Sequence, residues 1–405
     1  MSVSVMLLII LAFSCLLLYI STSFKQRQAR LMMSFSLFIV IIMLSFMAYY
    51  LQPVTGAYTD LERITNEVRM ISNGQFPEIA QRYALNPLSA VYIAFASLCH
   101  NANVLKFTSA LIMFSCLLYI PYAEWRDHRI SRFSFILTTV TTMAISNFPS
   151  YVFGVRQGPA CTLAVLAAYL YLVQKKHKSS IILLITAVLL HFSTIIIAGA
   201  LLVTHIRKQQ TYLIICALII GYTVISYAVV SMLSTTGLSF ASSLLGKMNG
   251  YYVFGSNFTM FASSLSQMCA YCRFFVSIML LMLYLHLYRE DNVKNQPYTR
   301  FFIVLLMVLV GSIPTGTPFR RFSMFALYAS IPILGYVLTK FLRNPRSRSV
   351  SPQRISAKEQ TRDRESVFLH YMLFIVMLAC IGVSVFYDWH SFIYYYLSSN
   401  QFYQV

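Results

Sequence analysis

Long apolar runs separated by short polar segments dominate this chain. A membrane-spanning helix needs about 20 mostly apolar residues. Runs near that length recur at residues 2–21, 31–50, 103–122, 133–152, 157–174, 211–232, 266–288, 321–340 and 366–387, and a shorter run occupies 301–313. The pattern predicts an all-α, polytopic integral membrane protein with about 10 spanning helices in one transmembrane helical domain, residues 1–405.

Composition supports a membrane protein and argues against a soluble one. Hydrophobic residues make up 58% of the chain and charged residues only 11%, whereas a soluble domain carries about 25% charged residues. The net charge of +19 is typical of nucleic-acid binding. However, the basic residues lie between apolar spans rather than on one soluble face, so no nucleic-acid partner is expected.

Basic clusters between the runs predict the orientation. Lysine and arginine prefer cytoplasmic loops, and the clusters that follow the first, third and fifth runs all reach the cytoplasm if the N-terminus lies outside. Two outer loops then follow, at residues 51–102 and 233–265. Residues 341–365 are rich in Arg, Ser and Pro, which indicates a disordered cytoplasmic linker.

Two apolar stretches do not fit simple spans. The run at 180–204 has basic clusters at both ends, so we expect a re-entrant pair of half-helices that meet near His191. One tilted span that locally violates the charge rule is the alternative. The stretch at 88–98 is too short to cross a membrane and predicts a short interfacial or re-entrant helix.

Arginines near the outer ends of the spans are the first candidates for chemistry. Arg156 precedes one run, Arg320 and Arg321 begin another, and Arg273 lies inside a third. An ionisable residue at membrane depth is costly and is therefore a functional candidate. A guanidinium group also matches the geometry of phosphate oxygens. The alternative is a long side chain that reaches the interface without binding anything.

Candidate proton acceptors and sugar-binding residues are fewer. His191 titrates near neutral pH and lies at the expected break, although a hydrogen-bonded core histidine is the alternative. Asp60 is a second candidate base or a solvated loop acid. Tyr251 and Tyr252 are suited to stacking on sugars or to the membrane interface. Phosphate-loop, zinc-protease and D-x-D motifs are absent from the sequence, so we expect no metal or cofactor.

Two stretches, Val155 to Ala160 and Ala187 to Ser193, together resemble EpsG/Wzy-like bacterial polysaccharide polymerases. Val155 to Ala160 resembles that family's R-Q-x-x-A helix, and Ala187 to Ser193 resembles its A-x-x-x-H-x-S pattern after a basic turn. Shorter likenesses occur at Asp60 to Arg63, Asn86-Pro87-Leu88 and Arg320-Arg321-Phe322. Two positions depart from the family pattern, because Ile64 stands where an aromatic residue is expected and Asn86 replaces an acid.

The resemblance implies a glycosyltransferase-type polymerase in the bacterial cytoplasmic (inner) membrane. It would join undecaprenyl-diphosphate-linked oligosaccharide repeats on the outer face, for O-antigen, capsule or exopolysaccharide biosynthesis, without ATP, metal or cofactor. The arginines would bind diphosphate, and His191 or Asp60 would act as the base. The implied partners are the lipid-linked glycan, the bilayer, a chain-length regulator and a flippase. A lipid-linked oligosaccharide transporter, an O-antigen-ligase-type glycosyltransferase, a membrane acyltransferase and a scaffold are the alternatives.

Overall fold

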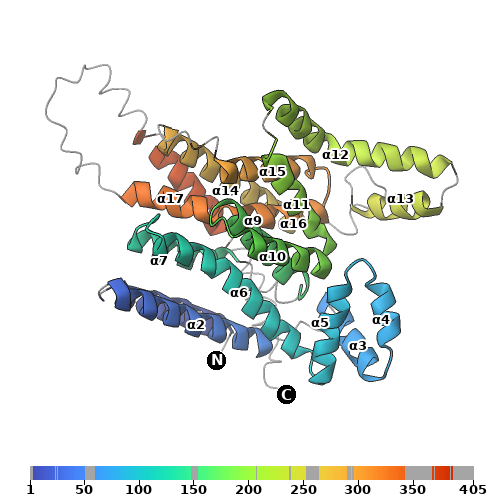
Figure 1. Ribbon diagram of the computed structural model, residues 1–405, viewed down its shortest axis with the longest axis horizontal. Coiled ribbons are helices and arrows are strands. Elements are labelled where there is room, and N and C mark those ends of the chain that lie inside the picture. Colours follow the sequence, from blue (N-terminus) through green and yellow to red (C-terminus); the bar gives the residue numbers. More distant parts are fainter. Residues whose placement is uncertain are drawn as a thin grey trace. The chain divides into compact units, whose positions relative to one another are not determined.

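The computed structural model is built from helices (Figure 1). It describes residues 3–22, 24, 26–50, 60–146, 154–206, 208–236, 239–251, 264–289, 293, 296–342, 367–368, 370–383 and 385. No strand occurs within those ranges, so the predicted all-α class is confirmed there. The predicted linker at 341–365 lies outside the described residues from position 343 onward.

The chain divides into two compact units. Unit 1 comprises Met1–Ala198 with Val385–Val405, and unit 2 comprises Gly199–Ser384. The division falls within one helix, α11 (Ile195–Thr204). Each unit contains part of the predicted chemistry: unit 1 holds Arg156 and His191, and unit 2 holds the later arginines.

Six helices of unit 1 pack side by side along their lengths. They are α1 (Val3–Thr22), α2 (Gln26–Tyr50), α6 (Asn103–Arg126), α7 (Arg132–Ile145), α9 (Gln157–Leu172) and α10 (His177–Leu190). Helix α9 is buried on almost every side and lies between α6 and α10. Its fully buried alanines, such as Ala160, Ala164 and Ala168, allow the neighbouring backbones to approach closely.

The predicted outer loop 51–102 contains a three-helix cluster: α3 (Asp60–Ser72), α4 (Phe76–Arg82) and α5 (Pro87–Leu98). The buried face of α3 is formed by Leu61, Ile64 and Val68, which recur at helical spacing. Gly74 has a φ of +84°, a value that favours glycine, and it makes the turn from α3 to α4 possible. Helix α5 matches the short helix predicted at 88–98.

Unit 2 is a second helical bundle. It contains α12 (Gln209–Thr235), α13 (Ser239–Tyr251), α14 (Ser264–Leu287), α15 (Pro297–Gly311), α16 (Thr317–Ala329) and α17 (Ile331–Leu342). Helix α12 crosses α15 where α15 ends, and Thr223 Oγ1 donates a 2.5 Å hydrogen bond to the Gly311 carbonyl. Helix α13 lies inside the second predicted outer loop, and residues 252–263 of that loop lie outside the described ranges.

Long apolar helices in the described part of the chain are candidates for membrane spans. In the described part of the chain, four helices are long and apolar enough to cross a membrane: Arg27–Tyr50, Asn103–Arg126, Gln209–Thr235 and Gln267–Leu287. A fifth span is possible if α16 and α17, bent by 46°, count as one. The predicted figure of about 10 spans is therefore not confirmed. Several apolar runs hold helices of only 10–17 residues, because an apolar run does not mark where a helix ends.

The predicted break near His191 is present. Helix α10 ends at Leu190, His191 is extended at φ −154° and ψ 111°, and a 3₁₀ turn at Phe192–Thr194 leads into α11. Two short half-helices thus meet at His191, as the sequence predicted. That the pair enters and leaves on one side of the membrane stays a prediction.

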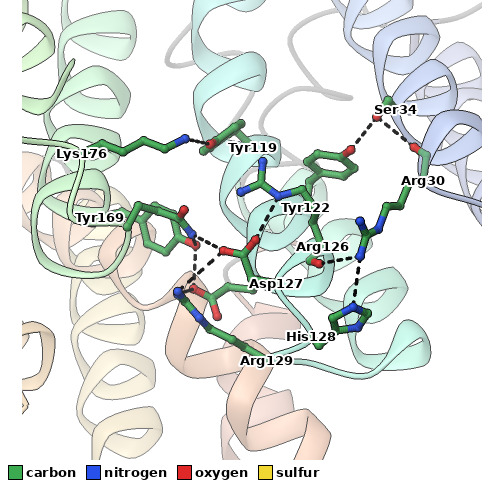
Figure 2. Close-up of polar contacts among 12 residues, drawn as sticks. Arg30, Ser34, Tyr119, Tyr122, Arg126, Asp127, His128, Arg129, Tyr169 and Lys176 are labelled. Carbon is green, nitrogen blue, oxygen red and sulfur yellow. Dashed lines mark hydrogen bonds and ion pairs between the residues drawn. The ribbon is translucent and has the colours of Figure 1, made fainter. Parts of the chain in front are cut away.

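A polar network joins two turns of unit 1 (Figure 2). Buried Glu124, near the end of α6, accepts a 2.7 Å hydrogen bond from the Tyr169 hydroxyl and a 3.1 Å bond from Arg129 Nη1. Gln174 Nε2 donates to Asp127 Oδ2 at 2.8 Å. These bonds tie the α6–α7 turn to the α9–α10 turn, on the side predicted to face the cytoplasm.

Candidate functional site

Arg156 is held at the start of α9. It is the N-cap residue of that helix, and only 8% of it is exposed. Its guanidinium carbon lies 4.7 Å from the centroid of the Tyr83 ring, a cation–π geometry. The preceding carbonyl, of Val155, accepts a 2.9 Å hydrogen bond from Ser109 on α6. The turn that carries this predicted site residue is therefore fixed to the body of unit 1.

Tyr83 connects Arg156 to a buried carboxylate, Glu67 on α3. The Tyr83 hydroxyl donates to Glu67 Oε2 at 2.7 Å, and Arg82 Nη1 donates to Oε1 at 2.8 Å. Arg63 Nε lies 3.9 Å from the same Oε1 atom. We call Arg63, Arg82 and Arg156, together with Glu67 and Tyr83, the arginine cluster.

The hydroxyl of Tyr83 is a hydrogen-bond donor at neutral pH. Burial raises the pKa of Tyr83 to about 12 against the lowering effect of Arg156, and the bond to Glu67 adds to the rise. A phenol with that pKa keeps its proton under physiological conditions. Tyr83 is therefore a structural donor to Glu67 and not a candidate base.

The break at His191 is stabilised by side chains from α5. Asn86 Oδ1 accepts a 2.7 Å hydrogen bond from the Phe192 backbone N–H, and Ser89 Oγ donates to the Leu190 carbonyl at 2.6 Å. Breaking a helix frees backbone groups that need such partners at membrane depth. Ser193 Oγ lies 2.8 Å from His191 Nδ1 and orients the imidazole.

One short segment contacts both candidate residues of unit 1. The α4–α5 connection, residues 83–89, begins with Tyr83, which faces Arg156, and continues to Asn86 and Ser89, which bind the His191 break. The connection is itself tight, since the Asn86 N–H donates to the Tyr83 carbonyl at 2.8 Å. Arg156 and His191 are thus brought to one region of unit 1.

The remaining predicted arginines lie in unit 2. Arg273 is buried on α14, and Arg320 and Arg321 are partly buried on α16. The ring of Phe319 packs against Tyr271 and Phe274, with centroid distances of 4.9 Å and 6.2 Å. Since Tyr271 and Phe274 flank Arg273, the helical turns that carry Arg273 and Arg320 lie against each other.

Three predicted residues are not placed in a site. Asp60 is the first residue of α3 and Tyr251 is the last residue of α13. Their side chains lie outside the described part of the structure, as does all of Tyr252. Among the residues that are described, no group of three or more His, Cys, Asp or Glu side chains is arranged to hold a metal ion.

Four residues that matter here were missed as site residues from the sequence: Glu67, Tyr83, Asn86 and Ser89. The four-residue spacing of Arg63 and Glu67 was an available signal, because such pairs meet on a helix. In the sequence, Asn86 stands out only because it replaces an acid that the family pattern leads one to expect. Its carbonyl oxygen performs a task that an acid also performs, which is to accept a backbone hydrogen bond.

Comparison with known proteins agrees with the sequence resemblance. Residues 80–351, more than half of the chain, match the model of the EpsG family. The matched residues include Tyr83, Arg156 and His191 and the three candidate arginines of unit 2, Arg273, Arg320 and Arg321. Asp60, Arg63 and Glu67 precede the matched range. Neither the curated proteins nor the solved structures contain a match. On the strength of the family model, this chain belongs to the EpsG family.

Proposed function

We propose that this protein is a polymerase that joins undecaprenyl-diphosphate-linked oligosaccharide repeat units on the outer face of the bacterial cytoplasmic membrane. Membership of the EpsG family supports a polysaccharide polymerase-type function, and the apolar helices agree with a membrane location. The main observation in support of the proposed site is the α4–α5 connection. It holds an arginine suited to diphosphate and a histidine suited to proton transfer in one region.

The reaction that we propose is a direct glycosyl transfer. A hydroxyl oxygen of the acceptor glycan forms a bond to the anomeric carbon of the donor, and the bond from that carbon to the lipid diphosphate breaks. His191 accepts the hydroxyl proton, and its ring is oriented by Ser193. Asp60 is the second candidate for this role. The leaving diphosphate is stabilised by guanidinium groups, as preorganised charge is in other transfer reactions.

Both substrates of such a polymerase carry a lipid diphosphate, and the chain has two groups of arginines. Arg156 lies in unit 1, and Arg273, Arg320 and Arg321 lie in unit 2. We propose that these arginines bind the diphosphates. Tyr251 and Tyr252 are proposed to stack on the sugars. The leaving group supplies the driving force, so neither ATP nor a metal is needed.

The rival functions share the ligand but not the product. A flippase would bind the same diphosphate and release it unchanged on the other side of the membrane. A ligase would transfer the same glycan to a different acceptor. Loss of a ligase would leave glycans of normal length on the lipid carrier. Loss of a flippase would leave single lipid-linked repeats that have not crossed the membrane.

Glycan length in a deletion strain tests the proposal. The strain is complemented with wild type, Arg156→Gln, His191→Ala or the control Arg69→Gln, whose exposed side chain lies outside the arginine cluster. All variants are first matched for membrane abundance. We expect ladders of lipid-linked glycan from wild type and Arg69→Gln, and single repeats from the other two. Unchanged glycan length in the deletion strain would rule out a polymerase.

A further inference from the structure

We propose that the arginine cluster is a diphosphate-binding site in which Arg63 and Arg82 bind the ligand together with Arg156. Glu67 is the residue that positions the two added arginines. The identity of the ligand rests on the proposed function, because that function requires lipid diphosphates as substrates.

Glu67 is a buried carboxylate. Only 1% of its side chain is exposed, and a buried carboxylate is costly unless it is paired and hydrogen-bonded. Tyr83 and Arg82 supply short hydrogen bonds, and Arg63 adds a longer contact. Glu67 is thereby a fixed anchor, and the arginines that contact it are held in defined positions.

The arginine cluster carries more positive than negative charge. Three guanidinium groups and one carboxylate make up the charged part of the cluster, so positive charge exceeds negative charge. An excess of positive charge in a partly desolvated place favours an anionic ligand.

The side chains of Arg63 and Arg82 are partly exposed. The side chains of Arg63 and Arg82 are 46% and 48% exposed, although both contact the same buried carboxylate. A guanidinium group has N–H donors along more than one edge. One edge of the Arg82 group can therefore hold Glu67 while its other N–H donors contact a second acceptor.

Diphosphate is the anion that fits these features best. Arginine forms bidentate, charge-assisted hydrogen bonds with phosphate oxygens. Several arginines held around one anchor suit a ligand with a negative charge on each of two adjacent phosphates. The position also suits the reaction, because Tyr83 connects this cluster to the segment that binds the His191 break.

A binding experiment tests the proposal without glycan transfer. Purified full-length protein in detergent is titrated with farnesyl diphosphate, and binding is followed by microscale thermophoresis. The test variant is Arg63→Gln with Arg82→Gln. The matched control is Arg69→Gln, which removes one positive charge from the same helix as Arg63 at an exposed position. Melting curves confirm that each variant is folded.

We expect the double variant to bind farnesyl diphosphate about tenfold or more weakly, because it loses charge-assisted contacts. The control should stay within about twofold of wild type, because Arg69 lies outside the arginine cluster. Inorganic diphosphate should compete in wild type. Equal binding by the double variant and the control, or no competition by inorganic diphosphate, or no binding by wild type, would overturn the site.

Glu67→Gln separates positioning from charge. The substitution removes a negative charge, so charge alone predicts tighter binding of farnesyl diphosphate. If Glu67 positions the arginines, binding weakens instead, and this is the result we expect. Tighter binding would contradict the positioning role. The binding assay contains no acceptor glycan and therefore does not measure polymerisation. Loss of the proposed diphosphate site and loss of the proposed polymerase function can thus be told apart.

Discussion

At the scale of single residues, hydrogen bonds from a few polar side chains organise the candidate site. Glu67, Tyr83 and Asn86 each satisfy a group that burial would otherwise penalise. None of them is expected to take part in bond making. Their contribution is to hold the arginines and His191 in position, so their substitution should affect stability and activity together.

Asn86 offers a sharp test of this view. Asn86→Leu removes the acceptor for the Phe192 N–H, which the break after α10 leaves outside the helix, so we expect a loss of about 1 kcal/mol in stability. We expect a lower melting temperature in detergent and shorter glycan ladders in cells. Asn86→Asp keeps an acceptor at the same place and should retain longer ladders than Asn86→Leu. Equal behaviour of the two variants would mean that this bond does not support the site.

Tyr83 makes a prediction about pH. Its pKa is raised to about 12 in the folded chain, above the value of about 10 expected when unfolded. The folded state therefore favours the protonated phenol. This contribution to stability is complete below about pH 10 and is lost as the pH rises toward the folded value of about 12.

A difference titration checks this prediction. The phenolate absorption of Tyr83→Phe is subtracted from that of wild type over the alkaline range. The residual signal should rise near pH 12. A rise near the ordinary tyrosine value would show that Tyr83 is neither buried nor bonded to Glu67 in solution. The Phe variant keeps the ring beneath Arg156, so the comparison isolates the hydroxyl.

At the scale of helices, close approach depends on small residues. The carbonyl end of α15 touches α12 at Gly311, where an added Cβ would collide with the Ile219 carbonyl oxygen and lie 2.9 Å from that of Ile220. These are backbone atoms, so a side-chain rotation cannot relieve the clash. The crossing of α12 and α15 therefore requires glycine at this position.

Gly311→Ala should separate these helices. We expect destabilisation of about 1–3 kcal/mol, typical of overpacking, and a lower melting temperature of the purified protein. The matched control is Gly199→Ala, in the apolar helix α11, where no atom lies within 4 Å of the added Cβ. That change should be neutral or slightly stabilising, because alanine favours helix. Similar melting temperatures for the two variants would contradict the close crossing.

At the scale of the whole molecule, orientation in the membrane is the main prediction. The basic clusters place the N-terminus and the three-helix cluster outside. Cys99, the C-cap residue of α5, is exposed and gives a natural reporter. A membrane-impermeant maleimide should label wild type in intact cells, and Cys99→Ser should lose that label.

The cytoplasmic side has its own reporter. Lys178→Cys in the Cys99→Ser background places a thiol at an exposed position in the first turn of α10. We expect labelling only after the cells are permeabilised. Labelling of Lys178→Cys in intact cells would reverse the predicted orientation and place the proposed site on the cytoplasmic face.

The sequence by itself determined the helical, membrane-bound character, the family and the break at His191. These properties are local, because they depend on apolar content, on basic flanks and on short motifs. For the same reason the sequence does not determine the number of spans: about 10 are predicted, and four or five candidates occur in the described ranges. Apolar composition continues across a helix break, as the bend between α16 and α17 within the run 321–340 shows. Contacts with neighbouring groups decide where a helix ends.

The tertiary structure alone decided which residues share a site. Tyr83 lies far from Arg156 in the sequence, and Asn86 lies far from Phe192, yet each pair is in contact. Such pairs form because a buried charge or a freed backbone N–H must find a partner, and a single sequence does not say which distant residue will supply it. Packing of the three-helix cluster against α6 and α10 determines which distant residues come into contact.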